Sequence, residues 1–264
     1  MEIINAHVHV YPDKIALKAA QSMGAFYNAP IRHNGTIADL LKENEENGIS
    51  RCLIHSVATT VRQVTSINNF IYEQMQQHSE FIGFMALHQD MDKHAIEDEV
   101  QRCIELGFKG VKLHPDCQKF NIDDKDMDKI YDTVAGKLPI LMHMGDTQYD
   151  NSSITRLLNI LNDKKDLQVI AAHMGGYSHW DEVGLYHNAK YDNFHFDTSS
   201  SLHFLGPYAA SMLINEFGAK KFFFGTDYPM WMAKDEISYI MSLPIMEKDK
   251  ELIFSKNLKD FLQL

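Results

Sequence analysis

Two histidines one residue apart stand near the start of the chain and could together bind a metal ion. His7 and His9 follow a short apolar run, and alternate side chains of a strand point to the same face. The pattern alone is weak, because His-x-His often arises by chance. It gains weight because similar residues recur at the ends of later apolar runs, at His143, His173 and Asp227.

Eight short apolar runs alternate with longer amphipathic segments. From the second onward they lie roughly 24 to 31 residues apart, about the length of one strand–helix unit. Strands that alternate with helices form a parallel sheet, so we predict an α/β fold, a closed (β/α)8 TIM barrel, as a single domain over residues 1–264. The runs are Ile3 to His7, Cys52 to His55, Phe81 to Leu87, Gly110 to Leu113, Pro139 to His143, Leu167 to Ala172, Phe194 to Asp197 and Lys221 to Gly225.

Helix signals lie between these runs. Thr36 followed by Asp39 resembles a capping box, and Gly48 suits a helix C-terminus. Further helices are expected at 93–106, at about 153–162 and, as a closing helix, at about 248–261. The alternative is an open doubly wound sheet, against which no Gly-x-Gly-x-x-Gly motif follows the first strand.

The carboxyl ends of the strands carry the active site in a (β/α)8 barrel. A strand-end histidine such as His55 or His88 can instead hydrogen-bond within the barrel, and Asp197 can either tether neighbouring groups or cap a helix. Histidines away from the strand ends, including His33 and His203, are expected to be exposed. The strand-end residues in chain order are His7 and His9, His55, His88, His114, His143, His173, Asp197 and Asp227.

Two of these residues have informative neighbours. Asp227 follows three consecutive phenylalanines, and a carboxylate removed from water there needs a cationic partner. His173 precedes Gly175 and Gly176, which allow the backbone to turn tightly near a ligand. Both residues are therefore expected to be functional.

Composition limits the classes of partner. The formal net charge of -11 argues against nucleic acid and anionic lipid, because both require clustered Lys and Arg. No run approaches the roughly 18 to 20 apolar residues of a membrane span, and we expect no leader peptide before His7. The 3 cysteines form no Cys-x-x-Cys pair, which favours reduced thiols and a cytoplasmic location.

The motifs together resemble a known family. His-x-His after the first strand, His after the fifth and sixth, and Asp after the eighth resemble the amidohydrolase superfamily. The segments Gly110–Pro115, His173–Gly176 and Phe224–Pro229 look like its amidohydrolase-2 branch, which includes aminocarboxymuconate-semialdehyde and resorcylate-type decarboxylases beside many hydrolases. The resemblance spans nearly the whole chain.

This resemblance implies a ligand set and a proton carrier. His7, His9, His143 and Asp227 would bind one divalent metal, most often zinc, and His173 would be the acid/base beside it. Asp227 would also be catalytic, as the acceptor of a proton. In the dinuclear alternative a carboxylated Lys112 bridges two metals, and His143 and His173 hold the second ion.

Two reactions fit such a site. The first is hydrolysis of a small amide, lactone or related C–N or C–O bond by a metal-activated water, since zinc lowers the pKa of its bound water to roughly 7. The alternative is non-oxidative decarboxylation of a carboxylated small molecule. We favour hydrolysis because decarboxylases of this branch are generally longer. A barrel that keeps its metal for structure or sensing is the third hypothesis.

The expected partner is a small-molecule substrate, and self-association into a homo-oligomer is compatible with the sequence. An arginine beside aromatic side chains suits a carboxylated or ring-bearing molecule. The same aromatic residues could instead pack the loops together. Candidate substrate-binding residues are Lys112, His114, Arg32 and Trp231.

Overall fold

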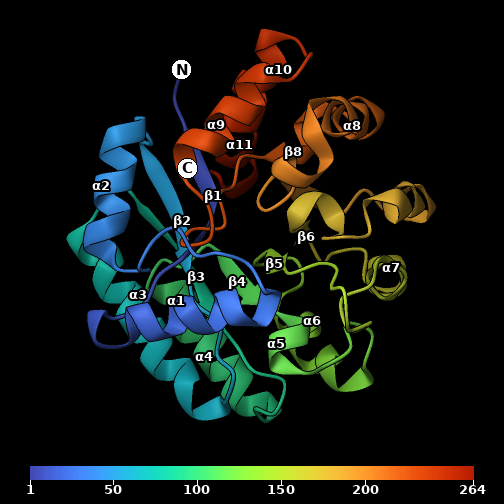
Figure 1. The fold of residues 1–264 in the computed structure, drawn as a ribbon. Coiled ribbons are helices and arrows are strands. Elements are labelled where there is room, and N and C mark those ends of the chain that lie inside the picture. The colour runs from blue at the N-terminus through green and yellow to red at the C-terminus, as the bar shows by residue number, and fades with distance from the viewer. The chain divides into compact units, whose positions relative to one another are not determined.

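The computed structural model describes residues 1–264 and contains eight strands in sequential sheet order (Figure 1). The ladders described are all parallel. Strands alternate with helices, which confirms the (β/α)8 fold. The strands are β1 (Ile4–His9), β2 (Arg51–His55), β3 (Phe81–Ala86), β4 (Gly110–Leu113), β5 (Ile140–Met142), β6 (Val169–Ala171), β7 (Phe194–Asp197) and β8 (Phe222–Phe223).

Helices fill the segments between the strands, and none of them combines the length and the apolar composition that crossing a membrane requires. The α-helices are α1 (Asp13–Tyr27), α2 (Ile37–Asn47), α3 (Val64–Gln77), α4 (Lys93–Glu105), α5 (Pro115–Gln118), α6 (Asp128–Val134), α7 (Ile154–Asp163), α8 (Leu202–Phe217), α9 (Ala233–Ser242), α10 (Glu247–Glu251) and α11 (Asn257–Leu262). The short helices include η3 (His173–Gly175), η4 (Trp180–Asn188) and the π-helix η6 (Leu252–Lys256), and the others are η1 (Val61–Gln63), η2 (Lys125–Met127) and η5 (Ala219–Lys221).

The predicted helix ends agree in part with the structure. Thr36 caps α2 by accepting a hydrogen bond from the Asp39 amide at 3.2 Å, and Gly48 ends the helix at a φ of 65°. The second half of the capping box differs, because the Asp39 carboxylate accepts from the Asn34 amide rather than from Thr36. The predicted closing helix is divided into α10, η6 and α11.

The contacts of the chain divide it into two compact units, which are described separately. The first comprises Met1–His55, Glu80–Ile82 and Asp197–Leu264, and the second comprises Ser56–Ser79 and Gly83–Phe196. The expectation of a single domain stays a prediction.

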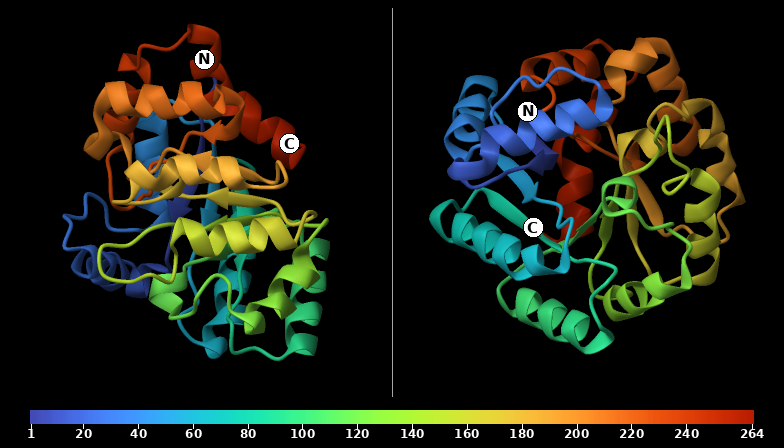
Figure 2. Two further views of the ribbon diagram at one scale, coloured as in Figure 1. Left: turned by 90° about the vertical axis from the view of Figure 1, so that its right-hand side faces the viewer. Right: turned by 60° about the horizontal axis from the view of Figure 1, so that its bottom comes forward.

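In the first unit, β1 pairs with β2 across a bulge. The register moves from Asn5 opposite Cys52 to Val8 opposite Ile54, so β1 has one extra residue in this interval. His7 lies in this interval, and both histidines of the pair belong to the strand rather than following it. Buried Phe223 of β8 and the following Phe224 pack on the C-terminal helices, and α8 packs against α9 (Figure 2, orange and red).

In the second unit, β4, β5 and β6 pair in register and are fully buried. Tyr186 packs on Phe194 and Phe196 with ring centroids 5.1 Å away in each case. Gly175 has a φ of 85°, and a Cβ at this position would lie 2.7 Å from a Phe196 ring atom. The tight turn expected after His173 therefore depends on glycine at position 175.

Candidate functional site

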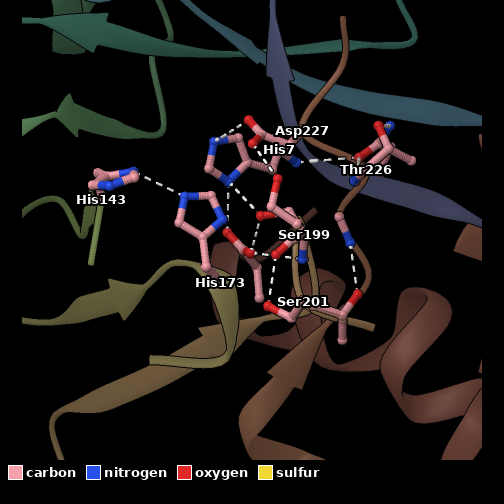
Figure 3. A network of polar contacts seen from close by, with 12 residues as sticks. His7, His143, His173, Ser199, Ser201, Thr226 and Asp227 are labelled. Carbon is pink, nitrogen blue, oxygen red and sulfur yellow. Dashed lines mark hydrogen bonds and ion pairs between the residues drawn. The ribbon is translucent and has the colours of Figure 1, made fainter. Parts of the chain in front are cut away.

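The first unit brings His7, His9 and Asp227 together. The Nε2 atoms of the two histidines lie 3.2 Å apart. Asp227 Oδ1 lies 3.3 Å from the His7 Nε2 and 3.5 Å from the His9 Nε2. All three residues are buried, and Figure 3 shows His7 and Asp227 facing each other. The structure thus confirms that the His-x-His pair points to one face.

These three separations fit a metal ion. Metal–ligand bonds of about 2.0 to 2.2 Å in a tetrahedral site place neighbouring ligand atoms about 3.3 to 3.6 Å apart. The observed separations of 3.2, 3.3 and 3.5 Å are close to this range. Two nitrogens and a carboxylate oxygen are also a donor set that divalent transition metals accept. His7, His9 and Asp227 therefore form a candidate metal centre.

Asp197 fixes the tautomer of His7. Its Oδ2 lies 2.8 Å from the His7 Nδ1, and a carboxylate can only accept there, so Nδ1 carries the proton. The lone pair of His7 is thereby left on Nε2, the atom that faces His9. Ser199 donates both its amide and its hydroxyl to Asp197 Oδ1. Of the two roles left open for Asp197, it has the tethering one.

The turn that carries Asp227 is tied to β1. The Asn5 side chain accepts from the Thr226 amide at 3.0 Å and donates to its hydroxyl at 2.8 Å. The Asp227 amide donates to the His7 carbonyl at 3.0 Å. Asp227 itself has a φ of 58°, a left-handed conformation that is uncommon outside glycine and that clusters at functional sites.

The second oxygen of Asp227 has its own donor. Ser200 donates its hydroxyl to Asp227 Oδ2 at 2.5 Å, and Trp231 donates its indole N–H to the Ser200 oxygen at 2.8 Å. From the sequence, Trp231 is expected only to contact substrate. Ser200 was not singled out, since serines in a polar run after a strand carry no distinctive signal.

Glu236 is another carboxyl that sequence reasoning missed. It lies on α9 and is buried, and its Oε2 has no hydrogen-bond partner. Burial, followed by the negative charge of Asp227, raises the pKa of the Glu236 carboxyl to about 8. A helical Glu in the pattern of an ordinary amphipathic helix gives no sign of such burial.

His55, one of the two weaker strand-end candidates, lies beside the pair. Its ring is 4.4 Å from the His9 ring and 5.0 Å from the His7 ring, centroid to centroid. The ring nitrogens of the three histidines are close enough for one ion. His88, by contrast, belongs to the second unit, where its Nδ1 accepts from the Asp90 amide at 3.1 Å.

The second unit brings His143 and His173 together. His173 Nε2 lies 2.9 Å from His143 Nδ1 (Figure 3). The Gly145 carbonyl lies 2.8 Å from His143 Nε2 and can only accept, so this nitrogen carries the proton. The lone pair of His143 is therefore on Nδ1. His173 has a φ of 61°, so it shares the left-handed backbone of Asp227.

The surroundings of His143 lower its pKa. Burial, followed by the charges of His114, His173 and Lys112, places the pKa of His143 well below its usual value, so the ring is neutral. His114 stacks on His143 with ring centroids 3.8 Å apart, and its Nδ1 accepts from the Cys117 amide at the start of α5. His114 thus caps a helix in addition to its predicted binding role. Lys112 is fully buried on β4.

Asp116 is a further buried carboxyl near His143. Its Oδ2 lies 3.7 Å from His143 Nε2 and accepts the Ser152 hydroxyl. Burial raises the pKa of Asp116 to about 6. Asp116 cannot be selected from the sequence, because an Asp directly after Pro115 is typical of the first turn of an ordinary helix.

The candidate Arg32 and two aromatic residues make mostly structural contacts. Arg32 is exposed, and its amide donates to the Pro229 carbonyl at 3.2 Å. Tyr228 donates its hydroxyl to the Thr36 carbonyl, and Trp180 donates its indole N–H to the His173 carbonyl. His33 was expected to be exposed, and this expectation is wrong, since its side chain is only 7% exposed between two carboxylates.

A (β/α)8 fold with histidines and a carboxylate near its strand ends is an arrangement that can hold a divalent metal. The family model described as Amidohydrolase matches residues 4–264. The chain belongs to this family. The resemblance seen in the sequence is thus confirmed, and the protein is an enzyme of the amidohydrolase-2 superfamily. No curated protein sequence matches it.

Solved structures share the fold at low identity. An uncharacterised TIM-barrel protein from Bordetella bronchiseptica has 17% identity and a TM-score of 0.80, with 100% of this chain and 99% of that chain covered. A dihydroxybenzoic acid decarboxylase from Polaromonas sp. JS666, with bound manganese and 2-nitroresorcinol, has 19% identity, a TM-score of 0.76 and coverages of 100% and 97%. A 5-carboxyvanillate decarboxylase from Novosphingobium aromaticivorans, complexed with manganese and a nitrobenzoic acid, has 14% identity, a TM-score of 0.79 and coverages of 100% and 96%.

Proposed function

We propose that this protein is a divalent-metal-dependent, non-oxidative decarboxylase of a small carboxylated aromatic molecule. The observation that carries the metal requirement is the spacing of His7 Nε2, His9 Nε2 and Asp227 Oδ1, at 3.2 to 3.5 Å from one another. The choice of reaction is supported by the manganese-containing decarboxylases that share the fold. The preference for hydrolysis depended on decarboxylases of this branch being longer than this chain. The match covers 97% of one decarboxylase chain, so length does not favour hydrolysis, and we propose decarboxylation instead.

His7, His9 and Asp227 would hold the metal, with His143 as the fourth ligand. The assignment of His143 rests on the family pattern, and its neutral ring with a lone pair on Nδ1 is suited to the task. A mononuclear site remains our proposal, with Lys112 uncarboxylated. The family match across residues 4–264 supports one functional domain. Manganese and zinc both accept this donor set, and metal analysis distinguishes them.

When bound, the metal would supply positive charge that holds a negatively charged substrate. The carbon–carbon bond to the carboxylate then breaks, its electron pair stays on the ring carbon, and carbon dioxide leaves. That carbon must receive one proton, and we assign this donation to His173. Ser200 donates a hydrogen bond to Oδ2 of Asp227 and so holds this carboxyl group in place. Lys112, His114, Arg32 and Trp231 are the proposed contacts to substrate.

Hydrolysis of an amide or lactone is the second candidate. The family description itself favours it, and the same ligand set would serve. In this reaction Asp227 would accept the proton of the attacking water and His173 would protonate the leaving group.

The cysteines and the net charge support a proposed cellular location and a class of binding partner. The cysteines are free, which supports our proposal of a reducing, cytoplasmic location. The net charge of -11 supports a small-molecule substrate over nucleic acid or anionic lipid.

The reaction in heavy water separates the two candidates. The protein, loaded with manganese or zinc, is given a panel of carboxylated phenols, lactones and amides. Decarboxylation releases carbon dioxide and places one deuterium on the ring carbon that lost the carboxylate. Hydrolysis releases an acid and puts no deuterium on carbon. Acid release without carbon dioxide would assign the chain to hydrolysis.

Variants of the ligands test the site itself. Wild type should bind about one metal ion per chain, and His7→Ala and Asp227→Asn should each abolish turnover. His143→Ala should lower the metal affinity, whereas His94→Ala, at an exposed position on α4, should change nothing. A wild-type protein that retains no metal after metal-replete purification would overturn the proposal.

A further inference from the structure

We propose that Trp231 and Ser200 form a positioning chain that restricts Asp227 to binding its metal through a single oxygen. The inference rests on the proposed metal site. It assigns Trp231 a role through Ser200, in addition to its predicted contact with substrate. The chain consists of two hydrogen bonds, from Trp231 Nε1 to Ser200 Oγ at 2.8 Å and from Ser200 Oγ to Asp227 Oδ2 at 2.5 Å.

The direction of both hydrogen bonds follows from the chemistry of the groups. An indole N–H is only a donor, so Ser200 must accept from Trp231. A serine hydroxyl has one proton, and the Asp227 carboxylate can receive it. Trp231 is therefore a donor, Ser200 both accepts and donates, and Asp227 is an acceptor. Removal of the indole N–H would release the Ser200 hydroxyl to rotate away from the carboxylate.

The backbone supports this arrangement at both ends. Ser200 has a φ of 48° and Asp227 a φ of 58°, so both residues of the short hydrogen bond lie in the left-handed region. Residues without glycine's freedom occupy this region at a cost and only where the surroundings require it. Two left-handed residues are thus needed to bring the Ser200 hydroxyl to the Asp227 carboxylate.

The indole ring is also held in place. The Trp231 ring lies 5.7 Å from the His203 ring and 5.8 Å from the Phe204 ring, both on α8. The orientation of the indole N–H is therefore set by α8 as well as by its own loop. Ser200 lies two residues before the start of α8, so the same segment supplies the hydroxyl and the ring contacts.

The consequence concerns the two oxygens of Asp227. Oδ2 is engaged by Ser200, while Oδ1 faces His7 Nε2 at 3.3 Å and His9 Nε2 at 3.5 Å. A carboxylate free to rotate could offer both oxygens to a metal. The two hydrogen bonds from Trp231 to Ser200 and from Ser200 to Asp227 prevent this rotation, so Asp227 presents Oδ1 alone beside the two imidazoles.

The experiment compares Ser200→Gly, Trp231→Phe and the double variant. Glycine accepts a φ of 48° without strain, so it removes the hydroxyl and leaves the turn intact. Manganese affinity of the metal-free proteins is measured by calorimetric titration, and the visible spectrum of the cobalt-loaded proteins reports coordination. Ser211→Ala is the control, since this serine on α8 donates only to the Pro207 carbonyl.

We expect Ser200→Gly to weaken manganese binding about 10- to 100-fold, as is usual for partners of a metal ligand. Trp231→Phe should weaken it about three- to tenfold in wild type and not at all in the Ser200→Gly background, because its effect passes through Ser200. The cobalt spectrum should change in both variants, and Ser211→Ala should match wild type.

Two results would overturn the inference while leaving the proposed metal site intact. One is a manganese affinity in Ser200→Gly equal to that of wild type. The other is an equal loss of manganese affinity from Trp231→Phe in the wild-type and the Ser200→Gly backgrounds. Failure of wild type itself to bind manganese would instead contradict the proposed function.

Discussion

Asp197 Oδ2 lies 2.8 Å from His7 Nδ1, and both side chains are wholly shielded from solvent. This pair decides which nitrogen of His7 can bind a metal. The other oxygen of Asp197 accepts the backbone amide of Ser199 at 3.0 Å, a donor that cannot be reversed. Asp197 therefore offers an acceptor on both sides, which only a carboxylate can do.

Asp197→Asn should reverse the tautomer of His7. The asparagine oxygen must face the Ser199 amide, so its NH2 group faces His7 Nδ1 and moves the ring proton to Nε2. We expect metal affinity to fall about 10- to 100-fold. Nitrogen-15 NMR of the His7 ring checks the tautomer directly. Ser199→Ala, which keeps the backbone amide, is the milder control. A proton retained on Nδ1 in Asp197→Asn would contradict this account.

Gly225→Ala should damage the metal site through packing. A Cβ at this position would lie 3.0 Å from the His7 Cβ and 3.2 Å from the Ser199 Cβ. Crowding of a packed site typically costs about 1 to 3 kcal/mol of stability. Gly107→Ala is the matched control, because that glycine has a φ of 91° but nothing within 4 Å of its added Cβ. Both variants should lose stability by thermal unfolding, and only Gly225→Ala should lose metal affinity.

The positions of the strands could be predicted because buried parallel strands are short apolar runs at regular intervals. The same rhythm predicts His9 at the end of β1 and His143 directly after β5, whereas His7 lies within β1 and Asp227 lies four residues beyond β8. The exact ends of the strands could not be predicted. The predicted run is Lys221 to Gly225, whereas β8 comprises only Phe222–Phe223, because the length of a strand depends on pairing with its neighbours as well as on hydropathy.

The partners of the site residues could not be predicted. Asn5, Ser200 and Glu236 are ordinary residue types whose importance comes from what lies beside them after folding. Asn5 and Thr226 are separated by 221 positions, yet their side chains are 2.8 Å apart. A pattern within one sequence segment contains no information about such a pairing.

The three thiols should be inert in the native protein. Burial raises the pKa of Cys52, Cys103 and Cys117 to about 12, so almost no thiolate exists at pH 8. An aromatic disulfide reagent at pH 8 should therefore label no thiol within minutes, and all 3 cysteines after unfolding in urea. Cys117 is the least buried of the three. Fast labelling that disappears in Cys117→Ser would show that this thiol is ionised.

His33 should give the stability a defined pH dependence. Its Nδ1 lies 3.3 Å from Asp39 Oδ2 and its Nε2 lies 3.4 Å from Glu43 Oε1. Burial by itself lowers the pKa of His33, but the two carboxylates outweigh it and raise the pKa above 6.5. Burial alone would raise the pKa of Glu43, whereas His33 and the Ala233 amide lower it below 4.5.

The raised pKa of His33 and the lowered pKa of Glu43 determine the pH range in which the ion pairs stabilise the fold. Since the pKa of His33 is raised in the folded state, its contribution is complete below pH 6.5 and is lost as the pH rises through the folded value. The contribution of Glu43 is complete above pH 4.5 and is lost as the pH falls through its lowered folded value. The ion pairs therefore stabilise the fold most between these limits.

Urea unfolding of His33→Gln without metal tests this window. The difference in free energy of unfolding from wild type should be largest near pH 5.5 and should shrink as the pH rises through the raised folded pKa of His33. His94→Gln serves as the control, because the His94 side chain is 94% exposed and should give a small difference at every pH. A difference for His33→Gln that stays constant from pH 5.5 to 8.5 would mean that its contribution is packing rather than charge.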